Sequence, residues 1–231
     1  FVDFTAGFGV ASVGHAHPDV VKAGQQQLER LPHAMGDAFP DAQRIRLLEA
    51  LAEMTGLDRG ILGSSGSDAV EAALKTARMA TGRDGVLAFE GGYHGLSYGA
   101  RAATHYKSEY FKGPFEGQLG QHVQHIPYGH LPDSLLEFGA VVVEPIQGRG
   151  GMRCPPKGWL KRLATLCRRD GALLVFDEVY TGFGRTGRLF GFEESEVRPD
   201  LLCLGKGMAG GFPISVCMGS AEVMDAWGAS R

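Results

Sequence analysis

The chain has 231 residues, a formal net charge of -3 and 44% hydrophobic residues. This length fits one large domain or slightly more, and the apolar content allows a sizeable core and excludes a disordered chain. The mildly acidic balance excludes the basic surface that nucleic-acid binding requires, so we expect no nucleic-acid partner.

The cysteines and the apolar runs indicate a cytoplasmic protein. The four cysteines include no C-x-x-C pair, which predicts reduced, mostly buried thiols rather than a disulfide framework. No apolar run reaches the length of a membrane span and no signal peptide is visible, so we expect no membrane association. The chain opens at Phe1 in a strand-like segment and stops just after a helical pattern, so we expect both ends to be cut.

Three helices are predicted early in the chain. The first follows Pro18 over "DVVKAGQQQLERL", and the second runs from Pro40, a favourable first-turn residue, through "DAQRIRLLEALAEMTG". The third follows "SSGSD" and extends over "AVEAALKTARMATG". Asp68 and Glu71 form a D-x-x-E signal for the start of this third helix.

Short apolar runs follow these helices, and they are continuous and β-branched rather than alternating, which is typical of strands buried on both faces. Strands that alternate with helices, such as the one predicted over "KGWLKRLATLCRRDG", indicate an α/β fold with a mostly parallel central sheet flanked by helices. The expected strands span residues 85–90, 139–145, 172–179, 201–205 and 214–219. We expect residues 1–35 to lead into a large domain over residues 36–231.

A dinucleotide fingerprint stands in the segment "LLVFDEVYTGFGRTG", where Gly182, Gly184 and Gly187 have the spacing G-x-G-x-x-G. A pyrophosphate needs the N-terminus of a helix directly after these glycines. The following "RLFGFEESEVRPD" has no helical repeat and reads as a loop. Asp200 precedes a strand, whereas a ribose-binding carboxylate should end one. We therefore interpret the match as accidental.

Two charged side chains follow buried strands. Asp177 ends the run "ALLVF" and Lys206 follows "LLCLG". Ligands of open α/β sheets bind at the carboxyl ends of strands. A partly buried lysine there has a lowered pKa and becomes a nucleophile toward carbonyl groups. A structural ion pair for Asp177 and an ordinary loop position for Lys206 are the alternatives.

Two further segments offer an anion site and aromatic rings. The segment "SSGSDA" opens the third helix, where free amides of Gly66 and Ser67 suit a phosphate. The segment "FEGGYHG" presents Tyr93 and His94 after two glycines. Plain helix capping and aromatic packing are the alternatives. Pyridoxal phosphate needs all four features: a phosphate site, a stacking ring, a carboxylate for the pyridine nitrogen and a lysine for the aldehyde.

These residues also match a known family. The chain resembles the class III pyridoxal-phosphate aminotransferases of fold type I, which include acetylornithine, ornithine and 4-aminobutyrate aminotransferases. The resemblance runs nearly end to end, through "GHAHPDVVKA", "SGSDAVEAALKTAR", "GGYHG", "VVVEPIQGRGG", "LLVFDEVYTGFGRTG" and "RPDLLCLGKGMAGGFPI".

The resemblance implies roles around the ring of the cofactor. Lys206 would form a Schiff base with the cofactor and shuttle a proton, and Asp177 would bind the pyridinium nitrogen, so both are expected to be catalytic. Tyr93 would stack on one face of the ring and Val179 would pack on the other. His94 would neighbour the ring without acting as the base.

The resemblance assigns the remaining cofactor contacts. Gly66 and Ser67 would hold the phosphate. Tyr180 stands where many relatives have Gln, and its hydroxyl would donate a hydrogen bond near the phenolic oxygen of the ring. Glu144, in "VEPIQG", matches a glutamate that often pairs with a substrate-site arginine in relatives.

Phe8 and Val10 resemble residues that line the substrate pocket of the family. Arg149 departs from the common "EPIQGEGG" pattern. Contact with an acidic group of the substrate and a surface position are the two alternatives for it, and we favour the surface position. Family members are roughly twice as long, so a small C-terminal domain is expected to be missing here. The family builds each site from two chains, which implies a homodimer.

The resemblance therefore implies an aminotransferase that moves an amino group from an amine or amino acid to an oxo acid or aldehyde. An aminomutase, a racemase or a decarboxylase on the same fold is an alternative, as is a non-catalytic fragment. No metal site is predicted, because His122, His125 and His130 lack a carboxylate or cysteine at suitable spacing and Pro and Gly favour a loop.

Overall fold

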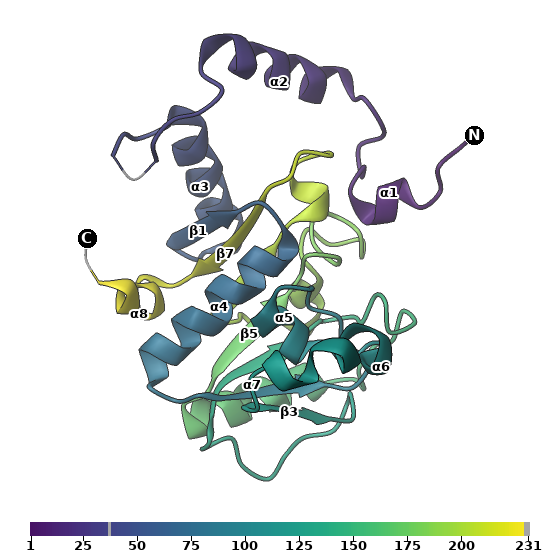
Figure 1. The fold of residues 1–231 in the computed structure, drawn as a ribbon, viewed down its shortest axis with the longest axis vertical. Helices are drawn as coiled ribbons and strands as arrows, with labels where there is room; N and C mark the ends of the chain where they lie inside the picture. Colours follow the sequence, from purple (N-terminus) through teal and green to yellow (C-terminus); the bar gives the residue numbers. More distant parts are fainter. Residues whose placement is uncertain (37, 229–231) are drawn as a thin grey trace.

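The computed structural model describes residues 1–36 and 38–228 and has an α/β architecture built on one sheet (Figure 1). The sheet has seven strands in the order β1-β7-β6-β5-β4-β2-β3. The strands are β1 Arg59–Gly63, β2 Gly85–Phe89, β3 Val123–Ile126, β4 Phe138–Val143, β5 Leu173–Asp177, β6 Leu201–Leu204 and β7 Ser215–Gly219.

The sheet is mostly parallel, as the alternation of strands and helices predicts. The pairs β2–β3, β2–β4, β4–β5 and β5–β6 are parallel. The strand β7 pairs antiparallel with both β6 and β1. Five parallel strands therefore end at the same edge of the sheet, which is where an open α/β sheet places its ligand site.

Helices cover both faces of the sheet, and Figure 1 shows α4 crossing one face with α7 on the far side. The α-helices are α1 Ala6–Gly9, α2 Pro18–Arg30, α3 Ala42–Thr55, α4 Gly66–Thr81, α5 Tyr98–Ala103, α6 Ser108–Phe111, α7 Trp159–Asp170 and α8 Ala221–Met224. The 3-10 helices are η1 Gly113–Gln118, η2 Gly191–Ser195, η3 Lys206–Met208 and η4 Asp225–Trp227.

Each face of the sheet carries its own hydrophobic core. In β4 every residue is buried, and the side chains alternate between the two cores. Val141 and Val143 pack in the cluster that contains Trp159 of α7. Ala140 and Val142 pack in the cluster that contains the small buried residues of α4. This burial on both sides confirms the interpretation of the continuous apolar runs.

The start of α4 differs from the predicted D-x-x-E signal. The Ser65 hydroxyl accepts a hydrogen bond from the Asp68 amide, and the Asp68 carboxylate accepts one from the Ser65 amide. Glu71 takes no part in this capping box. Its carboxylate instead accepts hydrogen bonds from the amides of Gly99 and Ala100, which ties α5 to α4.

Other boundaries also differ from the sequence-based expectation. The helix predicted from Pro40 begins at Ala42, because the Asp41 carboxylate caps the amide of Gln43. The edge strands β1 and β3 were not predicted. His125 lies in β3 rather than in the expected loop. The boundary at residue 35 stays a prediction. No helix in the described part of the chain is both long and apolar enough to cross a membrane.

Candidate active site

The carboxyl ends of the parallel strands and the N-terminus of α4 surround a cavity of about 370 Å³. Tyr93 and His94 follow β2, Glu144 follows β4, Asp177 ends β5 and Lys206 follows β6. Every residue that the sequence predicted for the site lines this cavity, namely Phe8, Val10, Gly66, Ser67, Tyr93, His94, Glu144, Asp177, Val179, Tyr180 and Lys206.

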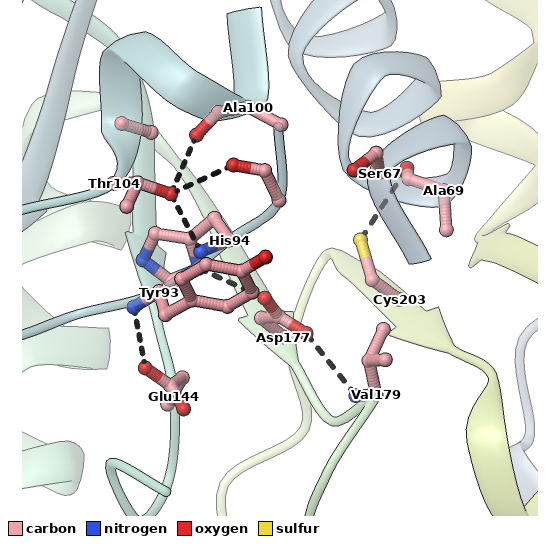
Figure 2. A network of polar contacts seen from close by, with 12 residues as sticks. Ser67, Ala69, Tyr93, His94, Ala100, Thr104, Glu144, Asp177, Val179 and Cys203 are labelled. Atoms are coloured by element: carbon pink, nitrogen blue, oxygen red, sulfur yellow. Dashed lines mark hydrogen bonds and ion pairs between the residues drawn. The ribbon is translucent and has the colours of Figure 1, made fainter. Parts of the chain in front are cut away.

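Asp177 and His94, which both line the cavity, form a buried pair (Figure 2). Asp177 is only 4% exposed and His94 only 3% exposed. The His94 Nδ1 lies 2.8 Å from the Asp177 Oδ2. The Asp177 Oδ1 accepts a hydrogen bond of 3.1 Å from the Val179 amide. The Thr104 hydroxyl oxygen accepts a hydrogen bond of 2.9 Å from the His94 amide. Both partners are therefore fixed by the backbone around them.

Asp177 controls the charge of His94. Burial alone disfavours a charged imidazole, but the hydrogen bond and the negative charge of Asp177, together with the charge of Glu144, outweigh it and raise the pKa of His94. A protonated His94 donates from its Nδ1 to the Asp177 carboxylate. Asp177 lines the cavity, with its Oδ2 next to His94 and its Oδ1 next to the Val179 amide.

The Glu144 carboxylate forms hydrogen bonds with the backbone of two loops instead of an ion pair with an arginine. Its Oε1 accepts a hydrogen bond of 2.9 Å from the Tyr93 amide, and its Oε2 accepts one of 3.0 Å from the Gly148 amide. No arginine of the described residues forms an ion pair with it. Burial raises the pKa of Glu144 to about 7, although the charge of His94 opposes this rise.

Lys206 occupies a strained turn after β6. Its φ of 42° lies in the left-handed region, which a non-glycine residue adopts only where the surrounding fold imposes it. Burial lowers the pKa of Lys206, while the charges of Asp177 and Glu144 oppose this effect and those of Arg149 and Arg185 add to it. The lysine amine is therefore closer to its neutral, nucleophilic form than an exposed lysine would be.

The N-terminus of α4 offers free backbone donors. The amides of Gly66 and Ser67 have no hydrogen-bond partner within the described part of the chain, as expected for the first turn of a helix. A Cβ on Gly66 would lie 2.8 Å from the Val179 Cγ1. Gly95, at φ +126°, is packed so closely on the Ser67 side chain that a Cβ would overlap it. Gly66 and Ser67 both line the cavity, so their free amides are available to a ligand there.

The opposite side of the cavity is aromatic. Figure 2 shows the Tyr93 ring on one side of Asp177 and Val179 on the other. The Arg149 guanidinium carbon lies 4.2 Å from the centroid of the Tyr93 ring. The Lys206 Nζ lies 5.1 Å from the centroid of the Tyr180 ring. A flat ligand between Tyr93 and Val179 would thus meet the Asp177 carboxylate, the lysine amine and the free amides of α4 together.

Sequence reasoning missed part of the lining. The interpretation of Arg149 as a surface residue was incomplete, because its exposed side chain folds over Tyr93 and lines the cavity. The departure from the common "EPIQGEGG" pattern at this position was the usable signal. The other residues missed are Ser64, Ser65, Gly95, Gly211, Phe212, Pro213 and Ile214.

Comparisons with known proteins agree with this geometry. The family model for class III aminotransferases matches residues 1–231. An acetylornithine aminotransferase from Methanopyrus kandleri is 42% identical, and the match covers 98% of this chain and 59% of that protein. An alanine/serine racemase from Pyrococcus horikoshii is 36% identical, over 97% of this chain and 54% of that protein.

A solved structure gives the same result. The ornithine aminotransferase of Toxoplasma gondii, whose active site contains partially occupied pyridoxal phosphate, superposes with a TM-score of 0.90 at 35% identity. This match covers 100% of the present chain and 57% of that chain. The chain thus spans less than two thirds of the length of these relatives, and over that span it belongs to the class III aminotransferase family.

Proposed function

We propose that the protein is a pyridoxal-phosphate-dependent aminotransferase, which moves an amino group from an amine or amino acid to an oxo acid or aldehyde. The observation that carries the proposal is the convergence of Asp177, Lys206 and the partnerless amides of Gly66 and Ser67 on one cavity. These groups match the nitrogen, the aldehyde and the phosphate of the cofactor.

Asp177 and Lys206 have different roles in the proposed reaction. When bound, the cofactor supplies an aldehyde that bonds to amines and a ring that withdraws electrons from the substrate. The Asp177 carboxylate would hold a proton at the ring nitrogen, and the hydrogen bond from His94 on its other side would support its negative charge. The Lys206 Nζ accepts and returns a proton at the reacting carbon, for which a lowered pKa is suited.

Other residues bind and orient. The amides of Gly66 and Ser67 would hold the phosphate at the positive end of α4. Tyr93 and Val179 restrict a flat ligand to one plane and exclude water from its faces. The Tyr180 hydroxyl would donate a hydrogen bond to the cofactor ring, and Phe8 and Val10 would line the space for the substrate.

A racemase is the second candidate, because one relative of the chain is named alanine/serine racemase. The two reactions differ in whether a second substrate is needed. An aminotransferase consumes an oxo acid and releases a new amino acid, whereas a racemase inverts a single amino acid without an acceptor. Analysis of the products with and without an oxo-acid acceptor separates the two.

Borohydride labelling tests the proposal directly. Cofactor added to the purified protein should produce a visible absorption band, and reduction should attach the cofactor to Lys206, as found by peptide mass spectrometry. Lys112 is a matched control, because burial lowers its pKa to about 8 although it lies outside the cavity. Labelling of Lys112 in preference to Lys206, or labelling that survives Lys206→Ala, would contradict the proposal.

We also propose a cytoplasmic homodimer. The scattered cysteines support a reducing compartment. Phe8 lines the cavity and yet is 68% exposed, and Phe4 beside it is 95% exposed, so a second chain over this segment would bury apolar surface at the mouth of the site. Sedimentation measurements of the mass in solution test the dimer.

A further inference from the structure

Arg149 lies in the loop that follows β4 and borders two cavities. It lines the cavity that contains Lys206 and also a second cavity bordered by Tyr106, Phe111 and Gly150. Its guanidinium lies 4.2 Å from the Tyr93 centroid and 5.6 Å from the Phe8 centroid. The side chain is thus held by two aromatic rings and not by an anion.

The charge of Arg149 has no counterion in the described part of the chain. No carboxylate there lies within ion-pair distance of it. The carboxylate of Glu144, on the same loop, is already engaged by the amides of Tyr93 and Gly148. Arg185, the other arginine that acts on Lys206, differs because its guanidinium donates to the Gly9 carbonyl and the Ser12 hydroxyl.

We propose that Arg149 binds the carboxylate of the substrate, so that the protein acts on amines and oxo compounds that carry a carboxylate in addition to the reacting group. This inference rests on the proposed aminotransferase function and names its substrate class. Arg149 and Lys206 line the same cavity, so a substrate held at one end by the guanidinium extends its amine toward the reacting end.

A carboxylate fits this site better than a phosphate. The donors suited to phosphate are the free amides at the N-terminus of α4, whereas Arg149 belongs to the loop after β4. A planar guanidinium matches a carboxylate through two parallel hydrogen bonds. The contacts with Tyr93 and Phe8 hold the guanidinium in place before binding, which reduces the entropy lost when the pair forms.

The test measures binding without turnover. Calorimetry with the cofactor-saturated protein compares glutarate, a dicarboxylate, with glutaramide, its uncharged analogue. Arg149→Gln should weaken glutarate binding about 10- to 100-fold, the range expected for a charge-assisted bidentate pair, and should leave glutaramide unaffected. Arg149→Lys should lose part of this affinity, because lysine keeps the positive charge but lacks the two parallel N–H donors of the guanidinium.

Arg153→Gln is the matched control. Arg153 is an exposed arginine of the same loop, its guanidinium lies 6.0 Å from the centroid of Tyr128, and it does not line the Lys206 cavity. This variant should bind glutarate like the unmodified protein. A second control is thermal unfolding of Arg149→Gln, which should match that of the unmodified protein because the side chain is exposed.

Equal glutarate binding by the unmodified protein and Arg149→Gln would overturn the inference, as would an equal loss for glutarate and glutaramide, which would indicate a structural role at Tyr93. Absence of glutarate binding to the unmodified protein would also overturn it. Failure of the proposed function is seen separately, as absence of the borohydride label on Lys206. The kcat/KM ratio of an ω-amino carboxylate to the alkylamine of equal length should fall in Arg149→Gln.

Discussion

Glu178 is a buried carboxylate that has no cationic partner among residues 1–36 and 38–228, and it offers the sharpest test of the structure. The residue has 0% exposure. Its Oε2 accepts hydrogen bonds from the Gly191 amide at 2.7 Å and from the Thr181 hydroxyl at 2.9 Å. Its Oε1 accepts a hydrogen bond of 2.6 Å from the Phe192 amide. Burial raises the pKa of Glu178 from 4.5 to about 7, although these three hydrogen bonds oppose the rise.

The direction of the pH effect follows from this pKa. The unfolded chain ionises above pH 4.5, while the folded chain keeps the proton until about pH 7. The contribution of Glu178 to the free energy of unfolding is therefore present below pH 4.5 and is lost as pH rises to about 7. A tenfold change in proton affinity is worth about 1.4 kcal/mol, so the loss amounts to about 3 kcal/mol for this buried group.

The substitution Glu178→Gln removes the ionisable carboxyl group and replaces one of its two hydrogen-bond-accepting oxygens by an NH2 group. The amide nitrogen would face a buried N–H or O–H donor, which costs about 1–3 kcal/mol. This cost should be measured in full near pH 4.5, where the carboxyl group of Glu178 is protonated. Above about pH 7 it should vanish or reverse, because ionised Glu178 has by then lost its own contribution.

Urea unfolding of both proteins at several pH values measures this difference. Glu194→Gln is the control, because its carboxylate is 82% exposed and forms only a surface pair with Arg188. It should change the free energy of unfolding by less than about 0.5 kcal/mol at every pH. A difference between Glu178→Gln and the unmodified protein that stays constant with pH would refute the reasoning, since it would mean that Glu178 ionises alike in both states.

Three further predictions concern the site and the core. Asp177→Asn removes the charge that raises the pKa of His94, so an NMR titration should find the imidazole of His94 deprotonating at lower pH, and an unchanged titration would contradict the pairing. Gly95→Ala forces a Cβ against Ser67 at φ +126°, so spectroscopic titration should detect cofactor binding weakened at least about tenfold. Trp159→Phe removes a fully buried indole and its hydrogen bond to a backbone carbonyl, and urea unfolding should report a loss of about 2–3 kcal/mol.

The central strands and the main helices could be predicted because burial dictates their composition. The run "GAVVVEP" is apolar at every position since β4 faces a core on both sides. The site residues were equally visible, because Asp177 and Lys206 interrupt such runs at the point where each strand ends. A charged residue directly after a buried strand is an unusual signal with few physical explanations.

The edge strands and one part of the lining could not be predicted in the same way. β1 is only partly buried and contains Arg59 and two glycines, so it lacks the pattern of a central strand. The position of Arg149 depends on the path of the loop after β4 and on the Tyr93 ring, which comes from a distant part of the sequence. Such a contact is set by tertiary structure, and no local spacing encodes it.

The glycine pattern after β5 illustrates the same limit at a single turn. Gly184 and Gly187 have φ values of 86° and 88°, so both need the left-handed region that glycine adopts freely. The residues that follow lead only to the 3-10 helix η2, and no α-helix begins there to receive a pyrophosphate. Glu178 determines the path of this loop. Its carboxylate accepts hydrogen bonds from the amides of Gly191 and Phe192, which holds the returning chain against the end of β5. The spacing of glycines permits either path, and the buried carboxylate before them selects the returning loop.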